Sequence, residues 1–158
     1  MLMIKVLFVC LGNICRSPMA EAVFEDLIKK KGLKQHFDVD SAGVSNYHIG
    51  ELPHEGTIKK LKENEISSEG LKARQFSEND FEAFDYVIAM DDDNMEALEQ
   101  MMSSEPNTVV KKLLDYLPSQ EVTNVPDPFF TGDFEETYQL VSEACRHLLD
   151  EIRRSNNM

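Results

Sequence analysis

Short apolar runs alternate along this chain with longer segments in which apolar residues recur every three or four positions. The short runs predict buried strands, and the recurring spacing predicts helices with one buried face. We expect strands at residues 3–9, 37–40, 86–90 and 109–114, and helices near residues 19–30, 54–64, 93–102 and 134–153. This alternation predicts a three-layer α/β fold, in which a doubly wound, four-stranded parallel sheet has helices on both faces.

Length and composition favour one domain spanning residues 1–158. A chain of 158 residues with 42% hydrophobic content can bury a substantial core, and we find no repeat, low-complexity stretch or linker in it. The formal net charge of −13 disfavours binding to nucleic acid or to an anionic membrane surface. The first apolar run is too short to span a membrane and has no signal-peptide cleavage pattern.

The segment with the most chemistry is residues 10–17, Cys-Leu-Gly-Asn-Ile-Cys-Arg-Ser, which follows the first predicted strand. It leads into a helix that we expect to have Ser17 as its N-cap and Pro18 in its first turn. A loop between a strand end and a helix amino terminus directs backbone N–H groups inward and can hold a tetrahedral oxyanion. Gly12 and Asn13 tolerate the left-handed backbone that such a loop needs.

Two side chains of this loop supply reactivity. The planar guanidinium of Arg16 can hold two phosphate oxygens at once. A helix amino terminus and a nearby cation favour the thiolate form of Cys10, which can attack phosphorus in line and form phosphocysteine. The loop and Arg16 would hold the equatorial oxygens, so we expect neither a metal nor another cofactor. The expected phosphate-binding residues are Leu11, Gly12, Asn13, Ile14, Cys15 and Ser17.

This loop, with the Pro-Met-Ala-Glu-Ala that follows it, resembles the signature of the low-molecular-weight protein tyrosine phosphatases. The resemblance continues in the family's order at residues 40–43, 73–75, 84–91 and 125–129, so it covers nearly the whole chain. It implies hydrolysis of tyrosine-phosphorylated proteins or peptides through a cysteinyl-phosphate intermediate. Cys10 would then be the nucleophile and Arg16 the phosphate clamp.

Asp127 is the candidate general acid. A leaving phenolate needs a proton, and the neighbouring Pro126 and Pro128 both restrict the backbone around this carboxyl group. The resemblance implies that Asp127 first acts as an acid and then as the base for the water that hydrolyses phosphocysteine. A simple turn aspartate is the alternative interpretation.

Two aromatic residues are candidates for the walls of the site. The resemblance places Phe129 beside the substrate ring and Tyr47 on the opposite wall. Two aromatic walls around a deep site favour phosphotyrosine over the shorter phosphoserine. A surface loop tyrosine is the alternative interpretation of Tyr47.

Three other functions share parts of this pattern. An arsenate reductase of the same architecture needs further cysteines after the middle of the chain, and residues 17–144 contain none. A protein-arginine phosphatase usually has threonine at the loop position of Ile14, so the aliphatic side chain favours phosphotyrosine. A phosphopeptide-binding module with an inactive site would be expected if Cys10, Arg16 or Asp127 were replaced, and all three are present.

The remaining cysteines and the histidines give no metal-binding pattern. Cys15 has two compatible interpretations, a small buried residue and a partner for Cys10 in a reversible, protective disulfide. Cys145 falls within a predicted helix, and we expect solvated or capping roles for the histidines, which are His36, His48, His54 and His147. A reactive thiol needs a reducing compartment, so we expect a cytoplasmic protein, and we expect it to be a monomer.

Two further features concern the support of the loop. Residues 91–94 should open a helix at a strand end, and we expect them to cap that helix and to support the loop through Asn13. Many members of the family that this chain resembles have a histidine before the Ala-Arg-Gln segment that supports the loop serine. Residues 66–72 contain no histidine here, so the sequence leaves the orientation of Ser17 open.

Overall fold

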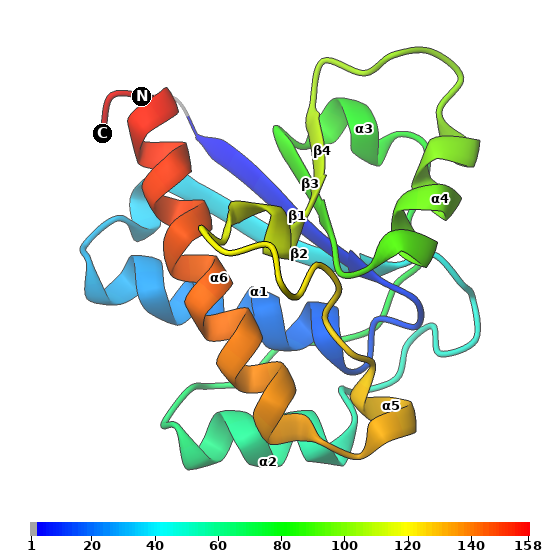
Figure 1. Cartoon of the computed structure of the whole chain (residues 1–158), viewed down its shortest axis with the longest axis vertical. Helices are drawn as coiled ribbons and strands as arrows, with labels where there is room; N and C mark the ends of the chain where they lie inside the picture. The colour runs from blue at the N-terminus through cyan, green and yellow to red at the C-terminus, as the bar shows by residue number, and fades with distance from the viewer. Residues whose placement is uncertain (1–2) are drawn as a thin grey trace.

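A four-stranded parallel sheet forms the centre of the molecule (Figure 1). The structure is a computed structural model, and it describes residues 3–158. The strands are β1 (Ile4–Cys10), β2 (Phe37–Gly43), β3 (Tyr86–Ala89) and β4 (Val109–Lys112), arranged in the order β2-β1-β3-β4. Since β1 pairs in parallel with both β2 and β3, the strand order reverses beside β1. The predicted doubly wound sheet is therefore confirmed.

Helices cover both faces of this sheet (Figure 1). On one face lie α1 (Arg16–Lys30), α2 (Glu55–Glu63) and α6 (Phe134–Ser155), and on the other lie α3 (Asp80–Ala83) and α4 (Asp92–Met101). The remaining short elements are η1 (Lys34–His36), η2 (Leu113–Tyr116) and α5 (Pro128–Thr131). These layers confirm the three-layer arrangement.

The alternation of side chains in β1 explains why its sequence is almost continuously apolar. Val6 and Phe8 belong to the larger core beneath α1 and α6, whereas Leu7 and Val9 belong to the smaller core beneath α3 and α4. All four side chains are fully buried. A strand that is covered on both faces is apolar over its covered length, and the one exposed residue of β1 is Lys5, near the start of the strand.

Two local predictions are wrong. The predicted strand at 109–114 ends at Lys112, because Leu113 and Leu114 turn into η2 and bury their side chains in the larger core. The predicted N-cap of α1 was Ser17, but the helix begins at Arg16 and its N-cap, Cys15, provides no side-chain hydrogen bond. Ser17 lies inside the first turn, where its hydroxyl bonds to other residues of the loop.

No helix within residues 3–158 combines the length and the apolar character needed to cross a lipid bilayer.

Candidate active site

The loop of residues 10–17 lies at the carboxyl edge of the sheet, beside the reversal of strand order, where ligand sites of open α/β sheets form. Its backbone is fixed to the segment after β2, because Val44 N–H donates to the carbonyl of Cys10 (3.0 Å) and Ser45 N–H to that of Leu11 (2.9 Å). Gly43 makes this close approach possible. A Cβ atom at Gly43 would lie only 2.9 Å from the carbonyl oxygen of Leu11.

Asn13 holds the loop from within. Its backbone is left-handed (φ 58°), as the sequence predicts, and its side chain is buried. The Nδ2 group donates to the hydroxyls of Ser17 (2.8 Å) and Ser41 (2.9 Å), while Oδ1 accepts from the backbone N–H of Arg74 (3.0 Å). All the hydrogen-bonding capacity of the amide nitrogen is therefore used within the fold.

The sulfur of Cys10 lies within reach of two hydrogen-bond donors. Cys10 Sγ is 3.0 Å from Ser17 Oγ, and it accepts from the backbone N–H of Asn13 at 3.3 Å. Since Ser17 Oγ already accepts from Asn13 Nδ2, its own hydrogen remains available for the sulfur. The orientation of Ser17, which the sequence leaves open, is thus provided by Asn13.

A second pair of polar groups lies behind Asn13. Ser41 Oγ donates to Glu21 Oε1 at 2.6 Å, so an unbroken series of hydrogen bonds joins the Glu21 carboxyl to the Cys10 sulfur. Burial raises the pKa of Glu21 to about 7, against the opposing effect of the Ser41 hydrogen bond. Glu21 and Ser41 thus support the loop in a chain whose residues 66–72 lack the histidine that many members of the resembled family have there.

Arg16 has one side-chain nitrogen without a hydrogen-bond partner among the residues that the structure describes. Nη1 donates to Asp91 Oδ2 (2.6 Å) and to the carbonyl of Val125 (3.0 Å), and Nη2 donates to Asp127 Oδ2 (3.3 Å). The buried Nε has no hydrogen-bond partner among residues 3–158. A buried unpaired donor costs roughly 1–3 kcal/mol, and an oxyanion bound in the loop would remove that penalty.

Asp91 has a different partner from the one predicted. As expected it caps α4, with Oδ1 accepting from Asn94 N–H at 2.8 Å. Its support of the loop does not pass through Asn13, because the partners of the Asn13 side chain are Ser17, Ser41 and Arg74. Instead, Oδ2 of Asp91 holds the guanidinium of Arg16.

A cavity of about 340 Å³ opens above the loop. It brings together most of the predicted site residues, namely Cys10, Leu11, Gly12, Ile14, Cys15, Arg16, Tyr47, Asp127 and Phe129, and adds His48 and Phe130. Asn13 and Ser17 are buried and do not line it. Asp127 is the N-cap of α5, with Oδ1 accepting from Phe129 N–H at 3.1 Å. Tyr47 is 74% exposed, so it lies at the mouth of the cavity.

Two histidines, His48 and His54, lie near the ring of Phe129 at the cavity, a position that their spacing in the sequence did not indicate. His48 lines the cavity, packs close to Gly12 and has Nδ1 2.9 Å from Glu51 Oε2. His54 caps α2, as expected for one of the default roles, by accepting from Gly56 N–H. Both lie near the ring of Phe129, with centroid distances of 6.5 Å for His48 and 6.1 Å for His54.

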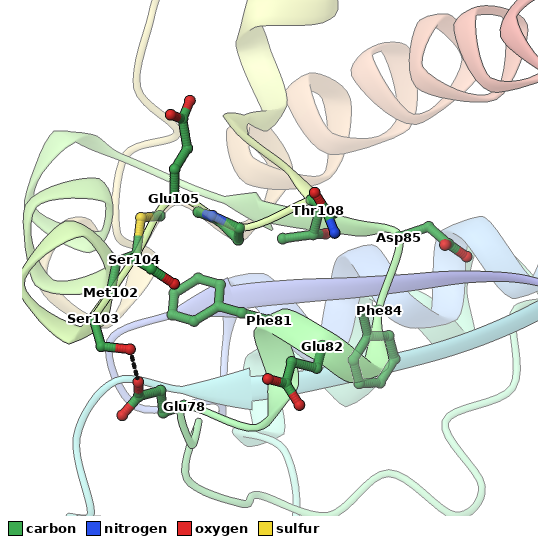
Figure 2. Close-up of a pocket in the computed structure, with 12 residues that line it drawn as sticks. Glu78, Phe81, Glu82, Phe84, Asp85, Met102, Ser103, Ser104, Glu105 and Thr108 are labelled. Carbon is green, nitrogen blue, oxygen red and sulfur yellow. Dashed lines mark hydrogen bonds between the residues drawn. The ribbon is translucent and has the colours of Figure 1, made fainter.

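A second cavity, of about 420 Å³, lies at the opposite edge of the sheet, before β3 and β4 (Figure 2). Its wall includes the rings of Phe81 and Phe84, and its charged residues are Glu78, Glu82, Asp85 and Glu105. Among residues 3–158, no lysine or arginine lines it. The negative lining makes this cavity unsuitable for a phosphate group.

The described residues also bear on metal binding and thiol chemistry. Across residues 3–158, no three His, Cys, Asp or Glu side chains come together in a way that could hold a metal ion. Cys10 and Cys15 are both free and buried. Burial, followed by the effect of Cys10, raises the pKa of Cys15 to about 12, so its thiol stays protonated at neutral pH.

A cysteine sulfur within reach of a hydroxyl and a backbone N–H, with an arginine and an aspartate lining the same cavity, suits a site that binds a phosphate group. The sequence model of the family described as low molecular weight phosphotyrosine protein phosphatase matches residues 5–158 of this chain. The chain therefore belongs to this family, which confirms the resemblance seen in the sequence, and it is a phosphatase.

Individual relatives agree over almost the full length. The chain is 50% identical over 156 residues to the low molecular weight protein-tyrosine-phosphatase YfkJ of Bacillus subtilis, covering 99% of this chain and 100% of YfkJ. The crystal structure of YfkJ matches with a TM-score of 0.94 at 51% identity, covering 97% of this chain and 96% of that one. The crystal structure of DARP, a Drosophila arginine phosphatase, matches with a TM-score of 0.88 at 36% identity, covering 95% and 98%.

Proposed function

We propose that this protein hydrolyses phosphotyrosine in proteins or peptides through a cysteinyl-phosphate intermediate. The observation that carries the proposal is that a candidate nucleophile and a hydrogen-bond donor without a partner lie in the same loop. The Cys10 sulfur is held by the Ser17 hydroxyl and the Asn13 N–H, and the buried Nε of Arg16 lacks a protein partner in the described chain. A phosphate in the loop would place its phosphorus above the sulfur and an oxygen near this nitrogen.

In the first step, the Cys10 thiolate attacks phosphorus and the bond to the tyrosine oxygen breaks. The electron pair of that bond stays on the leaving oxygen, and Asp127 donates the proton that it needs. Oδ2 of Asp127 lies 3.3 Å from Nη2 of Arg16, so the proposed acid and the proposed phosphate clamp lie side by side in the cavity.

In the second step, the Asp127 carboxylate takes a proton from a water molecule that attacks phosphocysteine. The sulfur–phosphorus bond breaks, inorganic phosphate is formed, and the thiolate returns. The Ser17 hydroxyl and the Asn13 N–H lie close enough to stabilise the negative sulfur as it leaves. Asp127 regains its proton in this step, so the cycle closes with water as the only co-reactant.

Substrate choice follows from the lining of the cavity. Phe129 and Tyr47 provide aromatic surface for a phenyl ring. Ile14 adds an aliphatic wall and offers no side-chain hydrogen-bonding group to a guanidinium, which favours phosphotyrosine. The structural similarity to the arginine phosphatase DARP makes phosphoarginine the second candidate substrate.

The setting of the enzyme is part of the same proposal. We infer one catalytic domain over residues 1–158, acting as a monomer and without a metal, because Arg16 and the loop donors supply the positive field at the phosphate. A thiolate nucleophile needs a reducing environment, which supports a cytoplasmic location. The net charge of −13 supports a role away from nucleic acids and anionic membranes.

The test is a panel of phosphotyrosine, phosphoarginine and phosphoserine peptides, assayed with and without a metal chelator. We expect phosphotyrosine to be the preferred substrate and the chelator to have no effect. Cys10→Ser should abolish turnover and leave the circular dichroism spectrum unchanged. If Cys10→Ser kept most of the activity, the assignment of Cys10 as the nucleophile would be wrong. A preference for phosphoarginine peptides would show that phosphoarginine, and not phosphotyrosine, is the substrate.

A further inference from the structure

His54 is tied to the phosphate loop and to α2 at the same time. Its backbone N–H donates to the carbonyl of Ile14 at 2.7 Å, and its Nδ1 accepts from Gly56 N–H at 2.9 Å. Because Nδ1 is the acceptor, the hydrogen of the neutral ring is on Nε2. Both ends of this residue are therefore fixed, which fixes the plane of its ring.

The ring of His54 lies against two phenylalanines from separate elements. It stacks on Phe134, the first residue of α6, with a centroid distance of 5.1 Å and an interplanar angle of 25°. It meets Phe129 of α5 edge-on, at 6.1 Å and 81°. The Phe134 ring also packs against Gly56 of α2, where a Cβ atom would lie 2.5 Å from it. His54 thus connects the start of α6 to Phe129.

Phe129 in turn is one of two residues that hold the Asp127 carboxyl. Its backbone N–H donates to Asp127 Oδ1 at 3.1 Å, while Asp127 Oδ2 accepts from Arg16 at 3.3 Å. Helix α5 has only four residues, so its own backbone bonds give Phe129 little restraint. The ring of Phe129 is also 52% exposed, and the rings near it are those of Phe130 at 5.3 Å, His54 and His48.

We propose that His54 is a positioning residue for the general acid, acting through the ring of Phe129 on the Asp127 carboxyl. The inference rests on the proposed role of Asp127. His48 also lies near Phe129, at 6.5 Å, but its side-chain partner is the exposed carboxylate of Glu51. Of the two histidines, His54 is the one whose backbone N–H bonds to the phosphate loop and whose ring stacks on α6.

The experiment compares two substrates that differ in their need for an acid. Phenol leaves phenyl phosphate with a pKa of about 10, like tyrosine, whereas nitrophenol is far more acidic and leaves with little help. We define the leaving-group ratio as kcat/KM for p-nitrophenyl phosphate divided by kcat/KM for phenyl phosphate. A general loss of folded protein lowers both values equally and leaves this ratio unchanged.

Two variants distinguish the effect of the His54 ring from the effect of its N-cap hydrogen bond to α2. His54→Asn keeps an N-cap acceptor and removes the ring, so it should raise the leaving-group ratio on the order of tenfold, part of the roughly 10²–10⁴-fold that a positioned acid provides. His54→Phe keeps a ring and removes the acceptor, so it should lower Tm and keep the ratio within about twofold of the wild-type value. An unchanged ratio in His54→Asn, or an equal rise in both variants, would overturn the inference.

Asp127→Asn is measured alongside these variants and should raise the ratio further than His54→Asn does. If Asp127→Asn raises the ratio and His54→Asn does not, the His54 inference fails while the acid assignment stands. If Asp127→Asn leaves the ratio unchanged, the acid assignment fails and the inference fails with it. Should His54→Asn not fold, Phe134→Leu removes the stacked ring and leaves the cap intact. An unchanged ratio in Phe134→Leu would also overturn the proposal.

Discussion

At the scale of single residues, the Ser17 hydroxyl is the group whose loss should affect the sulfur most directly. A hydrogen bond to a charged group contributes about 1.5–3 kcal/mol, so Ser17→Ala should lower kcat roughly 10- to 100-fold. Steady-state hydrolysis of p-nitrophenyl phosphate measures this. The matched control is Ser142→Ala in α6, whose buried hydroxyl has no hydrogen-bond partner in the described chain and which should keep wild-type kcat. Equal activity in both variants would exclude a role for Ser17.

The raised pKa of Glu21 predicts how the stability of the protein changes with pH. Burial raises its pKa from the ordinary 4.5 to about 7, opposed by the Ser41 hydrogen bond, and Asp40 and Glu25 raise it further against the opposing charge of Arg74. Between pH 4.5 and 7 the unfolded chain releases this proton and the folded chain keeps it. The contribution of Glu21 to stability is therefore fully present below pH 4.5 and is lost as pH rises through 7.

Glu21→Gln removes this ionisation, so the variant should gain stability relative to the wild type as pH rises. Urea unfolding at pH 5 and pH 8 should show a relative gain on the order of 1–3 kcal/mol at the higher pH, since one pKa unit corresponds to about 1.4 kcal/mol. Glu143→Gln, at an exposed position of α6, should show no such trend. A difference between Glu21→Gln and wild type that is the same at both pH values would contradict the assigned cause.

Sequence patterns identify the candidate reactive residues but not the residues that hold them in place. Cys10 and Arg16 share one short loop, so a local motif is enough to find them. Asp91 and Val125, which hold the guanidinium, lie 75 and 109 residues further along the chain, and no spacing relates them to it. The assignment of Ser17 as a cap failed for a different reason, because its hydroxyl bonds to Asn13 and Cys10 within the same loop and not to the backbone of the first helical turn.

At the scale of elements, α2 and α6 pack so closely that Gly56 has no room for a side chain. A Cβ atom there would lie 2.5 Å from two atoms of the Phe134 ring. Although alanine favours a helix over glycine, overpacking costs about 1–3 kcal/mol, so Gly56→Ala should be destabilising. Urea unfolding measures the change, and the exposed Lys59→Ala in the same helix should stay near the wild-type value. A stabilised Gly56→Ala would show that the ring moves freely.

The long elements could be predicted and the short ones could not. All four predicted helices are present, and each lies within three residues of its expected ends, because their apolar residues repeat over several turns. The four-residue elements α3, α5 and η2 contain too few residues for any period to show. Yet α5 carries Asp127 at its N-cap, so a motif in the sequence identifies this candidate acid, whereas its geometry comes only from the structure.

At the scale of the whole molecule, the attraction of a phosphate group comes from the site alone. The chain has 29 acidic against 16 basic residues, so its overall field repels anions. Within the cavity, Arg16 provides the only lysine or arginine charge among the lining residues. The sheet topology gathers this charge, the loop N–H groups and the sulfur at one edge, while the cavity at the opposite edge is acidic.

This charge distribution predicts which phosphopeptides react fastest. Phosphotyrosine peptides with basic residues beside the phosphotyrosine should have a higher kcat/KM than those with acidic residues there. The negatively charged protein attracts the basic flanks and repels the acidic ones. The preference should be severalfold at low salt and should shrink in 0.5 M NaCl, where the screening length falls from about 10 Å at 0.1 M to less than half of that. p-Nitrophenyl phosphate carries the phosphate charge without flanking residues, so its salt dependence measures the part that is due to the phosphate alone. A preference for acidic flanks, or one that salt leaves unchanged, would mean that local contacts at the mouth of the cavity, such as those of Tyr47 and His48, outweigh the overall charge.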